Sequence, residues 1–337
     1  MYFIGVDGGT TKTIALAADE HGQILGSARG TGSNWTGEDV EIPMAVVIQT
    51  VQTALDQAGL RGDDITLGVF SLAGADWPED HTRREAVLSK AGITQQLIVK
   101  NDSFGGLRAG ISRPYGMVIA AGTGLNAAVI APDGREWAFG YYETYGGAHT
   151  IAKEAFAAVL RAEDGRDGPT LMTAMVLKKL NFPTVEAVLR ASISQKIDRG
   201  AFLSLCPIVF DAALNGDSAA EQILLRQGRG LAEYAAAMVR RFGMRDLEFE
   251  VVLAGSVFKG SGPLLVDTIT QEVHRAAPRA VIVRPRFEPV VGSLLMAYDA
   301  MQLPVTWEMY QMLEKSVPAN EFFDTTSGIG YSSIYQE

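Results

Sequence analysis

The chain has 337 residues, of which 47% are hydrophobic and 20% are charged, and its formal net charge is −10. The length predicts roughly two domains of about 150 residues each, and the composition is that of a globular protein with a substantial core. The negative net charge disfavours binding to nucleic acid or to an anionic membrane surface. No apolar stretch approaches the roughly 20 residues that span a bilayer. The single cysteine, Cys206, excludes an intrachain disulfide framework and a cysteine-built metal site. The N-terminus reads as the start of a strand and lacks the basic head and cleavage site of a signal peptide, so we expect a cytoplasmic protein.

The first third of the chain alternates strands and helices. Apolar and β-branched runs predict three consecutive strands at 2–6, 13–18 and 24–29, the last two joined by a polar turn. Apolar residues at helical spacing then predict a helix at about 40–59. The remaining elements are a strand at 67–72, a helix at 79–91, a strand at 96–99 and a helix from Asp102. Three meandering strands followed by helix, strand, helix and strand give the order of an RNase H-like fold.

The same pattern then restarts. Short strands are predicted at 117–121, 127–131 and 136–140, followed by a helix at about 147–162. The region 166–211 is mostly helical without strands and reads as an insertion. The second half is completed by a helix at 218–242, a strand at 249–253, a helix at 262–277, a strand at 280–283 and a helix at 289–302. We therefore expect an α/β protein of two RNase H-like domains, 1–112 and 113–303, with a cleft between them.

The first glycine turn, Asp7-Gly8-Gly9-Thr10-Thr11-Lys12, ends the first strand in a carboxylate. Backbone amides and hydroxyls in such a turn can hold phosphate oxygens, and Asp7 can sit near a hydrated Mg²⁺. The alternative is an ordinary glycine hairpin, because Asp and Gly are common turn residues.

Two further glycine turns lie in the second half. The segment Gly122-Thr123-Gly124 follows the first strand of that half, so it occupies the position that residues 7–12 occupy in the first half. Gly255-Ser256-Val257-Phe258 joins a strand to a helix, where a flat ring can approach the backbone. We interpret the first of these turns as a site for phosphate groups and the second as a site for the base and ribose of a nucleotide. For both, the alternative is an ordinary tight turn.

Asp102 is the strongest catalytic candidate. It follows the strand at 96–99 and opens a helix, so it is either an N-cap, for which Asp is a favoured residue, or a base that accepts a proton from an attacking hydroxyl in phosphoryl transfer. Because it ends a strand bordering the expected cleft, catalysis is favoured.

Asn34 and Trp35 lie in a polar loop and offer an amide and an apolar face to a sugar ring. The alternative is a surface loop with the Trp35 side chain in the core.

Taken together, these segments resemble the sugar kinase/heat-shock/actin ATPase superfamily, and within it the N-acetylglucosamine kinase and BadF-type ATPase family. The resemblance covers roughly residues 1–302. It rests on DGGTTK at 7–12, GSNW at 32–35, SLAGAD at 71–76, ND at 101–102, AGTGLN at 121–126 and LAGSVFKGSGPLL at 253–265.

The resemblance implies ATP and Mg²⁺ held between two domains, and transfer of the γ-phosphate to the hydroxyl of an amino sugar or related hexose. It implies that residues 7–12 and 122–124 handle phosphates, that residues 255–258 bind adenosine, and that Asp102 is the base. The residues implied to face the sugar are Asn34, Trp35, Gly74, Ala75, Asn101, Asp102, Asn126 and Thr144.

One segment departs from the family pattern. Where kinases of N-acetylglucosamine carry Gly-Asp-Glu-Gly-Ser, this chain has Glu143-Thr144-Tyr145-Gly146-Gly147, so Thr144 stands where an acidic sugar ligand is expected. The identity of the sugar is therefore left open.

Two other classes of function compete with a kinase. One is an ATPase that activates a redox enzyme, whose relatives bind an iron–sulfur cluster through cysteines; the other is a non-catalytic sugar or nucleotide sensor. The tail at 304–337 is aromatic and packs either on its own chain or on a second subunit of a homodimer, and the sequence leaves both open.

Overall fold

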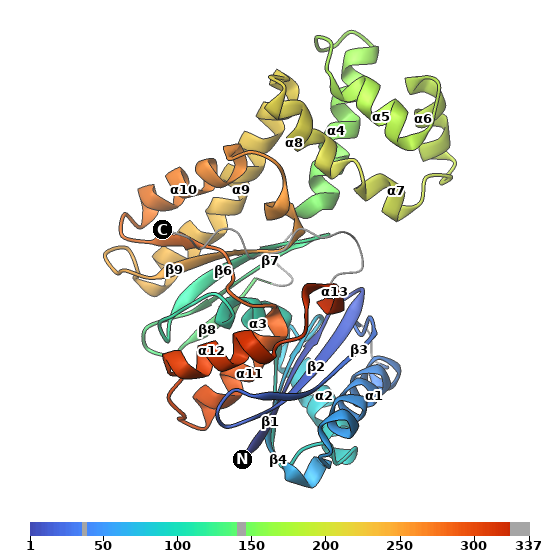
Figure 1. Ribbon diagram of the computed structural model, residues 1–337. Helices are drawn as coiled ribbons and strands as arrows, with labels where there is room; N and C mark the ends of the chain where they lie inside the picture. Colours follow the sequence, from blue (N-terminus) through green and yellow to red (C-terminus); the bar gives the residue numbers. More distant parts are fainter. Residues whose placement is uncertain (36–38, 140–145, 324–337) are drawn as a thin grey trace. The chain divides into compact units, whose positions relative to one another are not determined.

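The computed structural model describes residues 1–35, 39–139 and 146–323, and the chain forms two compact units (Figure 1). Unit 1 consists of Met1–Pro114 with Arg284–Glu337, and unit 2 of Tyr115–Val283. No helix among the described residues is both long and apolar enough to cross a membrane.

Unit 1 contains a five-stranded sheet in the order β3-β2-β1-β4-β5. Its strands are β1 (Tyr2–Gly8), β2 (Lys12–Asp19), β3 (Ile24–Thr31), β4 (Ile65–Leu72) and β5 (Leu97–Asn101). The first three pair antiparallel, whereas β1–β4 and β4–β5 pair parallel. The predicted meander followed by parallel strands is thus confirmed.

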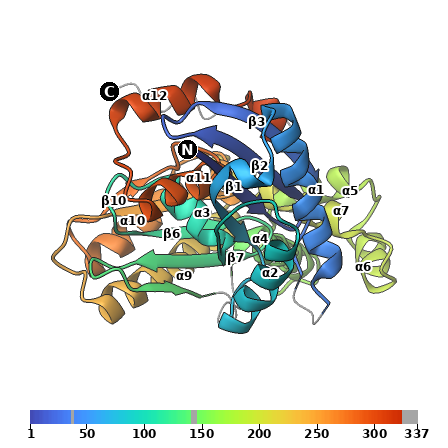
Figure 2. The ribbon, with the colours of Figure 1, turned by 90° about the horizontal axis from the view of Figure 1, so that it is seen from below.

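Helices cover both faces of this sheet (Figures 1 and 2). On one face lie α1 (Glu41–Ala58) and α2 (Pro78–Lys90), and on the other α11 (Pro289–Ala300) and α12 (Trp307–Ser316). Successive side chains of a strand point to opposite faces, so Ile4 packs in the core with α1 while Phe3 packs with α11. The ring of Phe3 meets that of Tyr298 edge to face, with 5.0 Å between their centroids. Burial on both faces explains why these strands are almost continuously apolar.

The position of α11 differs from the expectation that it completes the second domain, because it belongs to unit 1. Its residue Gly292 lies against Gly105 of α3 (Asp102–Arg108), where a Cβ on Gly292 would come within 1.9 Å of the Gly105 carbonyl oxygen. Ser293 donates a hydrogen bond to the Val6 carbonyl of β1 at 2.9 Å. The close approach of two glycine-bearing helices thus fixes α11 in the unit formed by the N-terminal strands.

The described part of the C-terminal tail packs on its own chain. Met309 and Leu313 of α12 and Phe323 of α13 (Asn320–Phe323) are buried in the same core as α11. The hydroxyl of Ser316 accepts a hydrogen bond from the Ile24 amide at 3.0 Å, which ties the end of α12 to β3. Of the two placements left open by the sequence, residues 304–323 adopt the first.

Unit 2 contains a second five-stranded sheet in the order β10-β9-β6-β7-β8. Its strands are β6 (Gly116–Ala121), β7 (Leu125–Ile130), β8 (Glu136–Ala138), β9 (Glu250–Ala254) and β10 (Val281–Val283). The pairs β6–β7 and β7–β8 are antiparallel, and β6–β9 and β9–β10 are parallel. In chain order within each sheet, the third, second, first, fourth and fifth strands therefore lie side by side in both units, which is the predicted duplication of architecture.

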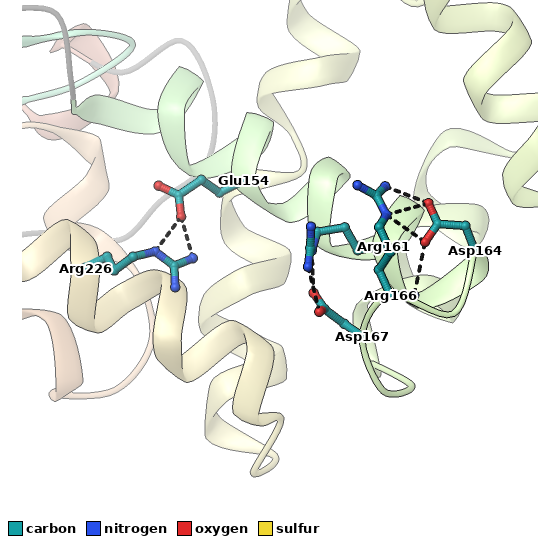
Figure 3. A network of polar contacts seen from close by, with 6 residues as sticks. All are labelled: Glu154, Arg161, Asp164, Arg166, Asp167 and Arg226. Carbon is teal, nitrogen blue, oxygen red and sulfur yellow. Dashed lines mark hydrogen bonds and ion pairs between the residues drawn. The ribbon is translucent and has the colours of Figure 1, made fainter.

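Between β8 and β9 the described chain is helical. The helices are α4 (Gly147–Glu163), α5 (Met172–Leu180), α6 (Val185–Ile193), α7 (Arg199–Leu203), α8 (Cys206–Leu214) and α9 (Ser218–Phe242). The short η3 (Ser256–Lys259) and α10 (Leu264–Ala276) follow β9. Glu154 of α4 accepts a hydrogen bond from Arg226 of α9 at 2.7 Å (Figure 3). It accepts another from Gln227 of the same helix at 2.8 Å. These bonds join two of the helices that pack in the core of unit 2.

Candidate functional site

In unit 1, the carboxyl ends of three parallel strands meet at one edge of the sheet. Gly8 of β1 is in register with Leu72 of β4, and Leu72 with Asn101 of β5. Asp7 precedes this row by one residue and Asp102 follows it by one. Parallel strands place their carboxyl ends together, and ligands bind at such ends in open α/β sheets. The structure thus brings the two predicted carboxylates to the same end of the sheet.

The electrostatics of Asp7 reflect this arrangement. Burial raises its pKa most, the negative charge of Asp102 raises it further, Lys12 lowers it and Glu288 raises it, so that the pKa is about 7. Ionising Asp7 is costly because the group is partly buried near other acids. A cation at this carboxylate would offset that cost.

Asp102 is the first residue of α3, and its neighbour Asn101 is the N-cap. The Asn101 side-chain oxygen accepts a hydrogen bond from the Ser103 amide at 3.0 Å, and its Nδ2 donates to the Asp76 carboxylate. Because Asn101, and not Asp102, is the N-cap of this helix, the capping alternative considered for Asp102 does not hold. Asn101, only 3% exposed, is committed to this cap and to Asp76.

The first glycine turn is fastened to the loop that carries Asn34. The Gly9 carbonyl accepts hydrogen bonds from the amides of Ser33 at 3.0 Å and Asn34 at 3.2 Å. The side-chain amide of Asn34 donates a hydrogen bond to the Thr10 hydroxyl at 3.0 Å. The predicted phosphate turn and the predicted sugar loop are therefore neighbours.

Trp35 is 42% exposed, so the alternative that placed it in the core does not hold. Its carbonyl accepts a hydrogen bond at 2.8 Å from Arg84, which is only 1% exposed. Gly74, at φ +77°, lets the chain pass the Trp35 carbonyl, which would lie 2.3 Å from a Cβ. Ala75 is fully buried, so its side chain is not presented to a ligand. Arg84 positions this loop, and nothing in its local sequence indicated that role.

The Lys12 side chain makes a hydrogen bond that the sequence did not predict. Its ammonium donates a hydrogen bond to the carbonyl of Phe323 in α13. Arg29 of the adjacent strand β3 donates to the carbonyl of Phe322 at 2.9 Å. The C-terminal helix therefore lies over the base of the first glycine turn.

In unit 2, the second and third glycine turns are also neighbours. Gly255, at φ +102°, would place a Cβ 2.4 Å from the Ala121 carbonyl oxygen, and Gly147, at φ +74°, would place one 2.4 Å from that of Gly124. Glycine is needed at both because of the positive φ and the close backbone. By contrast, a Cβ on Gly122 or Gly124 meets nothing within 4 Å, so the loop between them is open on its outer side.

The residues of the third turn divide into two kinds. Ser256 is exposed, but Val257 and Phe258 are 2% and 3% exposed and belong to the core of the second sheet. Their side chains are therefore unavailable to a nucleotide. Asn126 accepts a hydrogen bond from the Ala127 amide at 2.8 Å, and Thr144 lies outside the described residues.

A pocket of about 560 Å³ opens beside Thr123 and Gly124. Its other walls are Gly146, His149 and Thr150 around the start of α4, and Ile197, Arg199 and Phe202 at α7. No motif marks the residues of α7 in the sequence, because α7 is brought to the glycine loop only by tertiary packing.

Among the described residues, no three His, Cys, Asp or Glu side chains are grouped as a metal site. A hard cation such as Mg²⁺ needs few protein ligands, since it usually keeps several waters and binds one or two carboxylates together with phosphate oxygens. Asp7, with its raised pKa among other acids, fits that pattern.

Comparison with curated proteins shows similarity to sugar kinases. The chain is 26% identical over 318 residues to an N-acetyl-D-glucosamine kinase of Dictyostelium discoideum, covering 88% of this chain and 98% of that protein. It is 24% identical to an N-acetylmuramic acid/N-acetylglucosamine kinase of Clostridium acetobutylicum, with the same coverage of both chains. A glucosamine kinase of Vibrio cholerae is also 24% identical, covering 88% of this chain and 95% of that protein.

Solved structures share the fold. A Chromobacterium violaceum protein assigned as an N-acetylglucosamine kinase matches with a TM-score of 0.67 at 23% identity, covering 88% of this chain and 98% of that one. A glucokinase of the ROK family from Streptomyces griseus, solved with glucose and AMPPNP, matches with a TM-score of 0.56 at 18% identity, covering 89% and 100%. The family model of the BadF/BadG/BcrA/BcrD ATPases matches residues 4–297. The chain thus belongs to the BadF/BadG/BcrA/BcrD ATPase family.

Proposed function

We propose that this protein is an ATP-dependent kinase that transfers the γ-phosphate to a hydroxyl of an amino sugar or related hexose. The observation that carries the proposal is the pair Asp7 and Asp102 at one end of the first sheet. The curated relatives that match most of the chain are kinases of N-acetylglucosamine, N-acetylmuramic acid and glucosamine.

Asp102 is the residue that accepts the proton. The sugar hydroxyl oxygen forms a bond to the γ-phosphorus, the bond between that phosphorus and the β,γ-bridging oxygen breaks, and ADP leaves with the electron pair. The hydroxyl proton passes to the Asp102 carboxylate. Since phosphoryl transfer depends mostly on positioning and charge stabilisation, the cap at Asn101 contributes by fixing the start of the helix that carries Asp102.

The donor ATP binds through the glycine turns of both units. Residues 8–12 and 122–124 follow the first strand of their respective sheets, and the outer side of Gly122 and Gly124 is open. The equivalent positions support a shared role in holding the phosphates, with α5–α8 as the insertion of the second RNase H-like domain. Mg²⁺ at Asp7, through water, would neutralise phosphate charge.

The acceptor site is proposed at the loop of Asn34 and Trp35. Trp35 is exposed and carried on a loop that Arg84 and Gly9 fix. An exposed indole beside an amide suits a pyranose ring, which has apolar faces and hydroxyl edges. The acceptor is therefore a pyranose, and Thr144, where the resemblance implies an acid, bears on which one.

Cys206 argues against the redox-activating alternative. It is 6% exposed, and burial raises the pKa of its thiol to about 12. A cluster ligand must be a thiolate, so the sole cysteine is unsuited to bridge two chains.

The test is a panel of hexoses and amino sugars with ATP and Mg²⁺, read as sugar-stimulated ADP release and as the mass of the phosphorylated sugar. We expect one amino sugar or hexose to stimulate release. Gly124→Ala should fold normally yet bind ATP more weakly, because the added methyl enters the open side of the loop; Gly168→Ala, which is equally unhindered but outside the site, is the control. ATP binding without phosphorylation of any sugar would instead favour a sensor.

A further inference from the structure

Two cationic side chains on neighbouring strands of unit 1 point to the same face of the first sheet. In the antiparallel pair of β2 and β3, Lys12 is opposite Thr31 and Ile14 is opposite Arg29. Opposed residues of such a pair share a face, and side chains along one strand alternate between faces. Lys12, Ile14 and Arg29 therefore lie on one face, and Ile14 is buried there in a core that also contains Phe323 and residues of α11.

The carboxylate of Asp7 is on this face too. Asp7 is opposite Ile14 in the pair of β1 and β2. Burial raises the pKa of Asp7 most and the charge of Asp102 raises it further, whereas the charge of Lys12 lowers it. Because the attraction between charges falls with distance, Lys12 belongs to the immediate electrostatic surroundings of Asp7.

The end of α13 supplies acceptors for both cations. The Lys12 ammonium donates a hydrogen bond to the Phe323 carbonyl, and Arg29 donates one to the Phe322 carbonyl at 2.9 Å. The last carbonyls of a helix have no partner within the helix, so they are available to side chains. Two neighbouring strands thus hold one helix end through consecutive carbonyls.

The position of these carbonyls is fixed by packing. Phe323 is 3% exposed and lies in the core shared with α11. The rings of Phe322 and Phe323 meet edge to face, with 5.2 Å between their centroids, and the Phe322 amide donates to the Ala319 carbonyl at 2.9 Å. A fixed acceptor restricts the side chain that donates to it, and a lysine otherwise samples many rotamers.

The contact leaves the lysine able to bind a ligand. An ammonium has three donors and no acceptor, so one hydrogen bond to Phe323 leaves two donors for phosphate oxygens. The carbonyl is neutral, and it therefore orients the charge of Lys12 without cancelling it. Lysine binds phosphate as a point charge on a flexible stem, and the second contact is what determines where that charge lies.

We propose that α13 is a positioning element for the phosphate donor, because the Phe323 carbonyl holds the Lys12 ammonium in place at the first glycine turn. This inference rests on the proposed function, in which residues 8–12 hold phosphates. It gives the C-terminal segment a part in nucleotide binding, although no motif of the sequence lies there. Phe323 acts through Lys12 and is a positioning residue.

The experiment measures binding of AMPPNP with Mg²⁺ by calorimetry, together with the KM values for ATP and for the sugar. Lys12→Met should raise the Kd for AMPPNP by on the order of 10-fold, through loss of a charge-assisted hydrogen bond. Phe323→Ala should release α13 and raise this Kd by about 2- to 10-fold, because the ligand must then order the Lys12 side chain itself. The KM for ATP should follow the Kd, and the KM for the sugar should not change.

The double variant separates positioning from a general loss of structure. If Phe323 acts through Lys12, adding Phe323→Ala to Lys12→Met should not weaken AMPPNP binding further, because the two changes remove the same interaction. Arg29→Gln loosens the same helix end without shortening a core side chain, and it should raise the Kd by a smaller factor than Phe323→Ala.

Trp307→Ala is the control, since Trp307 is 59% exposed in the same C-terminal segment. It should leave every constant unchanged, and circular dichroism should show all variants folded.

The opposite results overturn the inference. If the losses of Lys12→Met and Phe323→Ala add in the double variant, Phe323 does not act through Lys12. Tighter binding of AMPPNP by Phe323→Ala would mean that α13 competes with phosphate for Lys12, and an unchanged Kd would mean that it has no effect on the site.

The failure of this inference and that of the proposed function are distinguishable. If a sugar is phosphorylated while Lys12→Met and Phe323→Ala bind AMPPNP normally, the positioning role is wrong and the kinase stands. If no sugar is phosphorylated but Phe323→Ala weakens AMPPNP binding only when Lys12 is present, the positioning role stands and the kinase does not. A wild-type protein that binds no AMPPNP would overturn both.

Discussion

Asp102 lies close enough to Asp7 for its negative charge to raise the pKa of Asp7, second only to the effect of burial. Asp7 lies on β1, whereas Asp102 begins α3 directly after β5, 95 positions further along the sequence. The parallel pairing of β1, β4 and β5 brings the two residues to one edge of the sheet. The pair gives the site its concentrated negative charge.

The first prediction concerns pH. The pKa of an aspartate in an unfolded chain is about 3.9, whereas that of Asp7 in the folded protein is about 7. The folded state therefore binds more protons between these values, and the free energy of unfolding should fall as the pH rises from 4 to 7. In EDTA, Asp7→Asn should be more stable than the wild type by about 2–4 kcal/mol at pH 8 and equal to it at pH 4.

Chemical denaturation at several pH values measures this difference. Asp63→Asn, at an exposed position of η1 (Gly62–Asp64), is the control and should follow the wild type at every pH. A difference between Asp7→Asn and the wild type that does not depend on pH would contradict the assigned pKa.

The second prediction concerns the contact of α3 with α11. Gly292→Ala would place a methyl 1.9 Å from the Gly105 carbonyl oxygen, which both helix backbones must move to accommodate. Overpacking of this kind costs about 1–3 kcal/mol, so the denaturation midpoint should fall. Gly168→Ala, whose methyl meets nothing within 4 Å, should leave the midpoint unchanged. Equal midpoints for both variants would show that the helices are not in contact through these glycines.

The third prediction concerns the C-terminal helix. Phe323 is 3% exposed, and its carbonyl accepts a hydrogen bond from the Lys12 ammonium. Phe323→Ala removes an aromatic side chain worth about 3–5 kcal/mol in a core, and at the end of a chain this should release α13 locally rather than unfold the protein. Trypsin should then cleave faster after Lys315, at the end of α12. Trp307→Ala, which removes a side chain that is 59% exposed in the same segment, should cleave at the wild-type rate.

The fold could largely be predicted because its signals are local. Strand and helix periods identified each of the strands β1 to β10, and the glycine turn after Asp7 lay where the structure ends β1. The helix at 218–242 was predicted with the bounds of α9. Where the chain folds back on itself, local signals fail. Chain order placed α11 in the second half, whereas its contacts with Gly105, Val6 and Ser71 place it in unit 1.

In the candidate site too, the residues marked by local motifs could be predicted, whereas those brought together by tertiary packing could not. Asp7, Asp102 and the loop of Trp35 were predicted from motifs and lie at one edge of the sheet or beside its first turn. The hydrogen bond from Lys12 to the Phe323 carbonyl joins residues 311 positions apart. The hydrogen bond from the buried Arg84 to Trp35 and the pocket wall at α7 likewise depend on tertiary packing. Val257 and Phe258 are assigned to adenosine through the backbone of their turn, and this assignment stays a prediction. Their apolar side chains lie in the core, so that any contact with adenosine would come from the backbone.

The most direct test of the account is the turnover of Asp102→Asn with the best sugar of the panel. Removal of a general base lowers the rate by about 10²- to 10⁴-fold, so we expect kcat to fall by that factor while the Kd for ADP stays within about threefold of the wild type. Asp63→Asn should keep full activity. A variant at Asp102 that phosphorylates the sugar at the wild-type rate would contradict the assignment of the proton acceptor, and with it the proposed chemistry of this site.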